Sequence, residues 1–175
     1  MSQSGPTFAE LLANCQESAV HLEMRDVYGV EEEDEDFAAW CAGRTYDLTD
    51  RATWWNGFHQ MVADAVARGV AFRRARVVSE PVSDYIRYEH SCTPQNLAAG
   101  EEVRWLARHR SSDLLLPGND LWIFDRHTVR YGLFSGDGRF LENVVERDAE
   151  IVKRHAGAFD AVWERAVPHE DYEIR

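Results

Sequence analysis

The spacing of apolar residues changes along this chain between that of a strand and that of a helix, and this change constrains the fold more than any other feature. From Val20 to Arg25 apolar and polar residues alternate strictly, which is the pattern of a strand with one buried face. Residues 54–66 and 151–166 instead place apolar side chains at helical spacing. Further strands are predicted at residues 70–78, 102–106, 121–125, 128–134 and 140–146. Alternating strands and helices predict an α/β domain with a mixed sheet flanked by helices, and an α+β arrangement is the alternative.

Capping residues set the predicted starts of two helices. Asp50 is predicted to cap a helix that ends at Gly69, and Ser79 is predicted to open one that runs to about Glu89. Residues 93–100 are predicted to form a loop or a broken turn.

The composition is that of a globular protein in a reducing compartment. The 175 residues are enough for one domain with its own core, and 45% of them are hydrophobic. No apolar run approaches the roughly 18 to 20 residues that cross a bilayer, and the first thirty residues lack the pattern of an export signal. Cys15, Cys41 and Cys92 match neither a disulfide framework nor a metal knuckle. We therefore predict a cytoplasmic protein without membrane contact.

Negative charge is concentrated in the first part of the chain. The net charge is −12, and residues 1–50 hold twelve acidic residues against Arg25 and Arg44. The run from Glu31 to Asp36 is wholly acidic and is predicted to lead a short helix. We predict an acidic extension at 1–50 and an α/β core at 51–168. Such a charge repels free nucleic acid and favours a basic protein partner.

The polar face of the first strand is one candidate site. His21, Glu23 and Arg25 lie two residues apart, with side chains roughly 6.5 to 7 Å from one another, and Asp26 lies just beyond them. A histidine beside a carboxylate can transfer protons, and an arginine can hold an anion. A solvated strand face uses the same residue types, so that interpretation stays open.

A second candidate site lies where a helix follows the strand at 70–78. Ser79, Glu80, Asp84, Tyr85 and Arg87 gather near that helix start, where α/β sheets commonly bind ligands and free N–H groups attract anions. The alternative is an ordinary helix cap at Ser79 and a surface ion pair between Asp84 and Arg87. Neither candidate site has metal-ligand spacing, and we predict no metal and no cofactor.

Arginines follow one another in the strand at 70–78. Alternation places Arg74 and Arg76 on the opposite face from Arg73. A phosphate-binding edge is one interpretation of this stretch, although no aromatic residues interleave with the arginines as nucleic-acid binding would favour.

Three stretches resemble an actinobacterial family of unknown function. They are the segment HLEMRDVY at 21–28, the segment SEPVSDYIR at 79–87 and the segment AGEEVRW at 99–105. Members of that family are commonly encoded beside helix-turn-helix regulators, and the resemblance implies a role beside transcription control.

Residues from about Trp54 onward resemble one half of the phospholipase D fold, which also serves as a sensor domain in some bacterial regulators. Enzymes of that superfamily use a His-x-Lys-x-x-x-x-Asp motif, in which His is the nucleophile, Lys binds phosphate and Asp orients the His. With the Asp aligned on Asp125, Gly118 takes the place of the His and Asp120 that of the Lys. Glycine cannot attack phosphorus and aspartate repels phosphate, so this alignment excludes the standard phosphodiesterase reaction.

Together these features predict a non-enzymatic regulatory or sensor module. It would bind a small ligand or a helix-turn-helix regulator through the regions of His21 and Ser79, with the acidic run facing the basic partner. The alternative is a hydrolase or phosphodiesterase-like enzyme in which His21 and Glu23 are acid and base and Arg25 or Arg87 holds an anion. An interaction scaffold that binds no small molecule is a third possibility. The ligand and the oligomeric state stay open.

Overall fold

A computed structural model describes residues 5–29 and 31–175, without the side chains of residues 31–34. Within this part the chain forms a seven-stranded sheet in the order β6-β5-β4-β1-β2-β3-β7. Its strands are β1 (Ser18–Glu23), β2 (Ala71–Val78), β3 (Glu102–Ala107), β4 (Leu121–Phe124), β5 (Thr128–Phe134), β6 (Phe140–Glu146) and β7 (Val167–Pro168). Strands β1, β2 and β3 are parallel, and the other neighbours are antiparallel. The sheet is therefore mixed.

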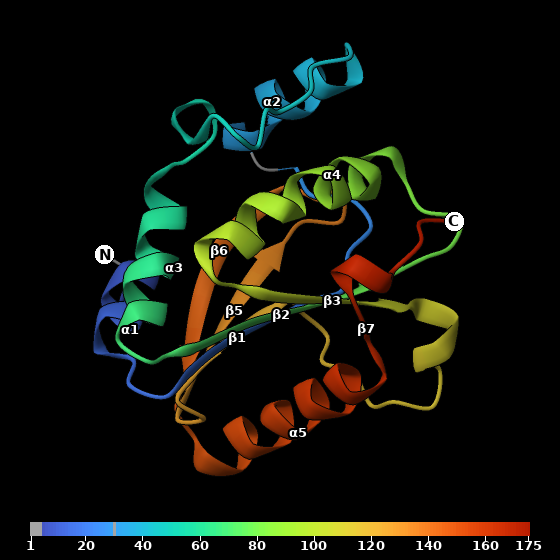
Figure 1. The fold of residues 1–175 in the computed structure, drawn as a ribbon. Helices are drawn as coiled ribbons and strands as arrows, with labels where there is room; N and C mark the ends of the chain where they lie inside the picture. Colours follow the sequence, from blue (N-terminus) through green and yellow to red (C-terminus); the bar gives the residue numbers. More distant parts are fainter. Residues whose placement is uncertain (1–4, 30) are drawn as a thin grey trace.

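Helices cover both faces of this sheet (Figure 1). They are α1 (Phe8–Asn14), α2 (Glu31–Cys41), α3 (Gly57–Ala67), α4 (Asp84–Ala99) and α5 (Ala149–Arg165), with short 3-10 helices at Arg51–Thr53, Arg108–Ser111 and His169–Asp171. Helix α5 lies alone below the sheet, helices α1, α3 and α4 lie on its other side, and α2 lies beyond α4. This arrangement confirms the predicted single α/β domain with helices on both sides of a mixed sheet.

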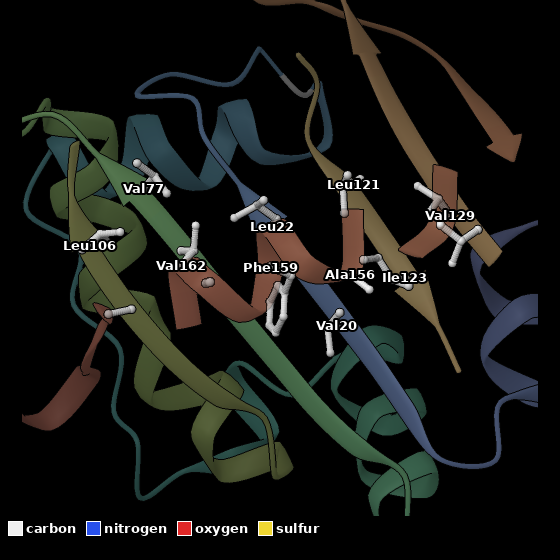
Figure 2. Close-up of a cluster of buried hydrophobic side chains, with 13 residues drawn as sticks. Val20, Leu22, Val77, Leu106, Leu121, Ile123, Val129, Ala156, Phe159 and Val162 are labelled. Atoms are coloured by element: carbon white, nitrogen blue, oxygen red, sulfur yellow. The ribbon is translucent and has the colours of Figure 1, made fainter. Parts of the chain in front are cut away.

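The main apolar core lies between the sheet and α5. Figure 2 shows Val20 and Leu22 of β1 beside Ile123 of β4, with Phe159 and Val162 of α5 packed against them. Because successive side chains of a strand point to opposite faces, burial of Val20 and Leu22 against α5 turns His21 and Glu23 toward α3 and α4. The alternation in β1 thus decides which side of the sheet carries polar groups.

Helix α3 begins later than predicted. A short 3-10 helix at Arg51–Thr53 precedes it, and Asn56, not Asp50, is its cap. Asn56 Oδ1 accepts hydrogen bonds from the backbone N–H groups of Phe58 and His59, at 3.0 and 3.2 Å. The capping side chain is thus satisfied locally, and the predicted helix start at Asp50 was wrong.

Helix α4 begins later and ends later than predicted. Ser83, not Ser79, caps it, and it continues through Pro94 to Ala99, where a loop was predicted. The turn around Pro94 is held by burial of Thr93 and Gln95 and by the Thr93 hydroxyl, which donates to the Glu89 carbonyl at 2.8 Å. Tertiary packing here outweighs the helix-breaking effect of proline.

The segment before residue 50 is part of the sheet. Strand β1 lies at its centre between β4 and β2, so a boundary at residue 50 does not separate an extension from a core. None of the helices in residues 5–29 and 31–175 is both long and apolar enough to traverse a bilayer.

Candidate ligand-binding cavity

A cavity of about 1000 Å³ lies on the side of the sheet opposite α5. Its volume is at the upper end of the range of small-molecule sites. Strands β1, β2, β4 and β5 form one wall, and α4, the start of α3 and the segment after α2 form the other. The polar and aromatic side chains that line it include His21, Glu23, Arg74, Arg76, Trp122 and Arg130 from the strands, Tyr85, Tyr88, Glu89, Gln95 and Asn96 from α4, and Tyr46, Trp54 and Trp55 from the segment before α3.

Buried ion pairs join the strand wall to α4. Glu23 Oε1 accepts a hydrogen bond from Arg74 Nη1 at 2.6 Å, and Glu23 Oε2 lies 2.9 Å from Arg76 Nε. Arg74 Nε also donates to Glu101 at 2.7 Å, and Arg76 pairs with Glu89 of α4. Burial alone would lower the pKa of Arg74, but Glu101 and Glu23 outweigh it and raise that pKa. Both arginines are thus charged and already neutralised.

His21 is held in this wall as a neutral imidazole. Its ring stacks on Trp122, with the centroids 4.0 Å apart and the planes 15° from parallel. Its Nδ1 lies 3.3 Å from Glu23 Oε1. Burial, with the charges of Arg74 and Arg76, lowers the pKa of His21 well below its usual value. A neutral imidazole offers one donor and one acceptor.

A buried carboxyl and phenol form a second polar pair of the cavity wall. The Tyr28 hydroxyl donates to Asp120 Oδ2, and the Met24 backbone N–H donates to Asp120 Oδ1 at 2.9 Å. Burial is the largest influence on Asp120 and raises its pKa to about 6. Asp120 therefore changes its protonation state near neutral pH.

Several hydrogen-bond donors of the cavity lining have no protein acceptor. In the described part of the chain these buried atoms include Trp54 Nε1, Gln95 Nε2 and Arg130 Nε. Trp54 and Gln95 are only 8% and 7% exposed. A buried donor without an acceptor is unfavourable by about 1–3 kcal/mol, so these groups favour an occupant that carries acceptor atoms.

The structure brings together only part of the candidate site residues. His21, Glu23 and Tyr85 line the cavity. The Arg25 guanidinium lies over the Phe134 ring instead, 4.8 Å from its centroid. Asp84 and Arg87 are exposed on α4. An enzyme site in which Arg87 holds a substrate beside His21 therefore does not match this arrangement.

Asp26 and Ser79 meet at the carboxyl ends of β1 and β2, in a cluster with a structural role. Asp26 accepts hydrogen bonds from the Ser79 backbone N–H and hydroxyl, at 2.7 and 2.6 Å. Arg108 donates to the carbonyls of Met24 and Val77, at 2.6 and 3.0 Å, and so ties the same strand ends together.

Glu80 lies apart from that cluster. It accepts a hydrogen bond from the Tyr172 hydroxyl at 2.8 Å, near the end of the described chain.

The sequence interpretation missed most of the strand wall. Alternation had placed Arg74 and Arg76 on one face, but nothing indicated that this face was the same as that of His21. The parallel register of β1 and β2, which pairs His21 with Arg74 and Glu23 with Arg76, supplies that link. Trp122 of β4 lies beside these residues because it pairs with His21 in the antiparallel register of β1 and β4.

Asp125 lies at the end of β4 remote from Asp120. Its carboxylate accepts hydrogen bonds from the backbone N–H groups of Gln16, Glu17 and Ser18, at 2.9, 2.7 and 2.9 Å, and the Cys15 thiol lies 3.1 Å away. Partial burial on its own would raise the pKa of Asp125, but the backbone hydrogen bonds outweigh burial and lower this pKa. Asp125 thus anchors the start of β1.

No group of three or more His, Cys, Asp or Glu within the described ranges is placed to hold a metal ion.

The fold of this domain is similar to that of phospholipase D family members. The chain is similar to Nuc from Salmonella typhimurium, described as a phospholipase D family member, with a TM-score of 0.51, 12% identity and coverage of 91% of this chain and 86% of that one. It is also similar to NucT from Helicobacter pylori, with a TM-score of 0.50, 11% identity and coverage of 91% and 87%. These likenesses concern the fold.

Residues 6–174 match the family described as a domain of unknown function, DUF6879, and the chain belongs to that family. TrmBL2, described as an archaeal chromatin protein, shares a TM-score of 0.48 and 17% identity over 90% of this chain and 47% of its own length. The chain thus spans about half of TrmBL2. No curated protein matches the sequence significantly.

Proposed function

We propose that this domain is a non-enzymatic sensor module that binds a small ligand in the cavity between the sheet and α4. The observation that carries the proposal is the lining of a cavity of about 1000 Å³, in which the residues Trp54 and Gln95 carry buried donors without protein acceptors. A core-filling role for these residues would have paired or excluded such groups.

The absence of catalytic chemistry is part of the proposal. In the alignment with phospholipase D enzymes, Gly118 and Asp120 take the places of the nucleophile and the phosphate-binding lysine. Asp120 instead accepts hydrogen bonds from Tyr28 and Met24, which fits a structural role in the cavity wall.

We further propose that the regulated partner is a helix-turn-helix regulator that contacts the acidic α2. Asp36 of this helix lines the cavity, as do Arg44 and Tyr46 of the segment that follows. A ligand that binds more tightly to one position of this wall would shift α2 toward that position. The acidic run at 31–36 would then carry the change to a basic surface, although the side chains of residues 31–34 lie outside the described residues.

Ligand binding is tested on protein purified from its native host. Native mass spectrometry is expected to show a non-covalent adduct of small-molecule mass, which is lost on gentle unfolding. Absence of any adduct, combined with no thermal shift from a metabolite collection, would contradict the proposed function.

The partner is tested by co-purification from the same host. We expect near-stoichiometric recovery of a helix-turn-helix protein, and the double variant Glu35→Lys/Asp36→Lys is expected to weaken it. The matched control is Glu142→Lys/Glu164→Lys, which reverses two exposed carboxylates elsewhere. Recovery of no DNA-binding protein would sink the partner assignment and leave ligand binding to be judged separately.

One observation favours an enzyme as the second candidate. His21 is a neutral imidazole in the cavity wall with its Nδ1 3.3 Å from Glu23 Oε1, and a neutral imidazole has a ring nitrogen that can accept a proton. A hydrolase screen that compares wild type with His21→Ala discriminates, since an enzyme loses its activity with the imidazole whereas a sensor shows the same background in both.

A further inference from the structure

We infer that the ligand is an uncharged, planar heteroaromatic molecule of nucleoside size or larger, and not a phosphorylated or otherwise strongly anionic compound. The inference rests on the proposed function and specifies which molecules the cavity accepts. Three features of the lining carry it: its charge balance, its aromatic groups and its unpartnered donors.

The charge balance argues against an anion. The two buried arginines of the strand wall are already engaged by Glu23, Glu89 and Glu101. The cavity lining as a whole contains four arginines and five carboxylate residues, namely Arg44, Arg74, Arg76 and Arg130 against Glu23, Asp36, Asp47, Glu89 and Asp120. A phosphate dianion would have to displace existing ion pairs and approach an excess of carboxylates.

Arg44 is not free to bind an anion, because it is paired with Asp36. Arg130 is the exception, since its Nε has no protein acceptor and burial lowers its pKa. One such guanidinium suits a carbonyl or ring-nitrogen acceptor, whereas phosphate sites usually combine several free donors.

Aromatic side chains line the cavity in two groups. At the start of α3, Trp54 and Trp55 lie with their ring centroids 5.7 Å apart, and His59 is 5.5 Å from each. Near the start of α4, Tyr85 lies 5.8 Å from Tyr28 and 6.0 Å from Tyr88. Side chains of this kind stabilise flat ligands by stacking and edge contacts, each worth roughly 0.5–1.5 kcal/mol beyond area burial in protein pairs.

The polar atoms without a protein partner indicate which hydrogen-bonding groups the ligand carries along its edge. Trp54 Nε1 and Gln95 Nε2 are both donors, and both belong to residues more than nine-tenths buried. They require acceptors, while Glu23 and Glu89 offer acceptor oxygens to a ligand N–H. A heteroaromatic ring with carbonyl or ring-nitrogen acceptors and amino or ring N–H donors satisfies both requirements in one plane. A hydrocarbon ring would leave the donors unsatisfied.

The probes are adenosine, guanosine, cytidine, uridine, riboflavin and neopterin, with the four nucleoside 5′-monophosphates and trehalose for comparison. At least one of the six uncharged heteroaromatics is expected to raise the Tm by about 5–10 °C at a concentration of 100 Kd. For a nucleoside that binds, its monophosphate is expected to bind at least tenfold more weakly.

Variants locate the binding in the cavity. Trp54→Phe keeps an aromatic ring and removes the N–H, and Gln95→Leu removes the amide, so each is expected to weaken binding about three- to tenfold. Neither variant removes a hydrogen bond within the protein, but Trp54→Phe also removes buried ring atoms, so the Kd is compared only at temperatures at which each variant is folded. Trp163→Phe on α5, beyond the other face of the sheet, is the matched control and should leave the Kd unchanged.

The outcomes separate this inference from the proposed function. Tighter binding of a monophosphate than of its nucleoside, or binding of trehalose alone, overturns the inference and leaves a ligand-binding cavity. Equal weakening by Trp54→Phe and Trp163→Phe also overturns it. No binding by any probe overturns it as well, and if native mass spectrometry likewise finds no adduct, the proposed function falls with it.

Discussion

At the scale of single residues, Asp120 gives the domain a pH-dependent stability. Its pKa is raised by burial to about 6, so the folded state prefers the protonated carboxyl. The stabilisation is therefore complete below the unfolded pKa of about 3.9 and is lost as the pH rises through about 6. A shift of about two pKa units corresponds to about 3 kcal/mol.

The variant Asp120→Asn isolates this effect from other titrating groups. Relative to wild type, its free energy of unfolding is expected to rise by up to about 3 kcal/mol between pH 4 and pH 7. Urea unfolding of both proteins at a series of pH values measures the difference. A difference that stays constant over this range would show that Asp120 titrates normally.

Two adjacent arginines of β2 are expected to differ sharply in their effect on stability. Arg74→Met leaves Glu101 without its cation and Glu23 with Arg76 alone in a buried setting, and we expect a loss of about 3–5 kcal/mol. Arg73→Met on the opposite face removes an exposed pair with Glu102 and should cost about 1 kcal/mol or less. The side chains are 10% and 40% exposed, respectively. Chemical unfolding of the two variants compares them, and similar losses would contradict the buried network.

At the scale of elements, the β4–β5 hairpin is tied to β1 through Asp125. Asp125→Ala leaves the N–H groups of Gln16, Glu17 and Ser18 without their acceptor, and we expect a loss of about 2–4 kcal/mol. Because the pKa of Asp125 is lowered on folding, this stabilisation is present above the unfolded pKa and is lost as the pH falls below it.

Unfolding of Asp125→Ala at pH 7 and pH 3 measures both effects. The matched control is Asp137→Ala in the turn after β5, where the carboxylate contacts Ser135 and Arg139 of the same turn. That variant should lose about 1 kcal/mol or less. A control as unstable as Asp125→Ala would mean that any turn carboxylate has this effect.

The elements also show how far the sequence could predict the structure. The alternation in β1 predicted that His21 and Glu23 share a face, because a period of two is a property of the strand itself. It could not show whether that face meets solvent or a cavity, since this depends on where α4 packs. The end of α4 was missed for a related reason: a Pro94 within the helix is tolerated only because of tertiary contacts that no local pattern records.

At the scale of the whole molecule, the sheet separates the main apolar core from the cavity. The face toward α5 holds a wholly apolar cluster in which Val162 is fully buried. The opposite face carries the ion pairs and the cavity. Leu121 belongs to the apolar cluster and also lines the cavity, but Val162 is not among the lining residues. Substitutions of Val162 and of a lining residue such as Gln95 are therefore expected to be additive.

Val162→Ala and Gln95→Leu test this separation in opposite directions. The first removes buried methyl groups and is expected to lower the free energy of unfolding by about 1–3 kcal/mol, with an unchanged Kd for the folded protein. The second is expected to leave stability nearly unchanged and to raise the Kd. Urea unfolding and calorimetric titration with the tightest-binding heteroaromatic measure the two quantities, and the double variant should show the sum of both changes. A tenfold weaker Kd in Val162→Ala would mean that the α5 layer sets the shape of the cavity through the sheet, because a loss of packing on one face would then move the strand wall on the other.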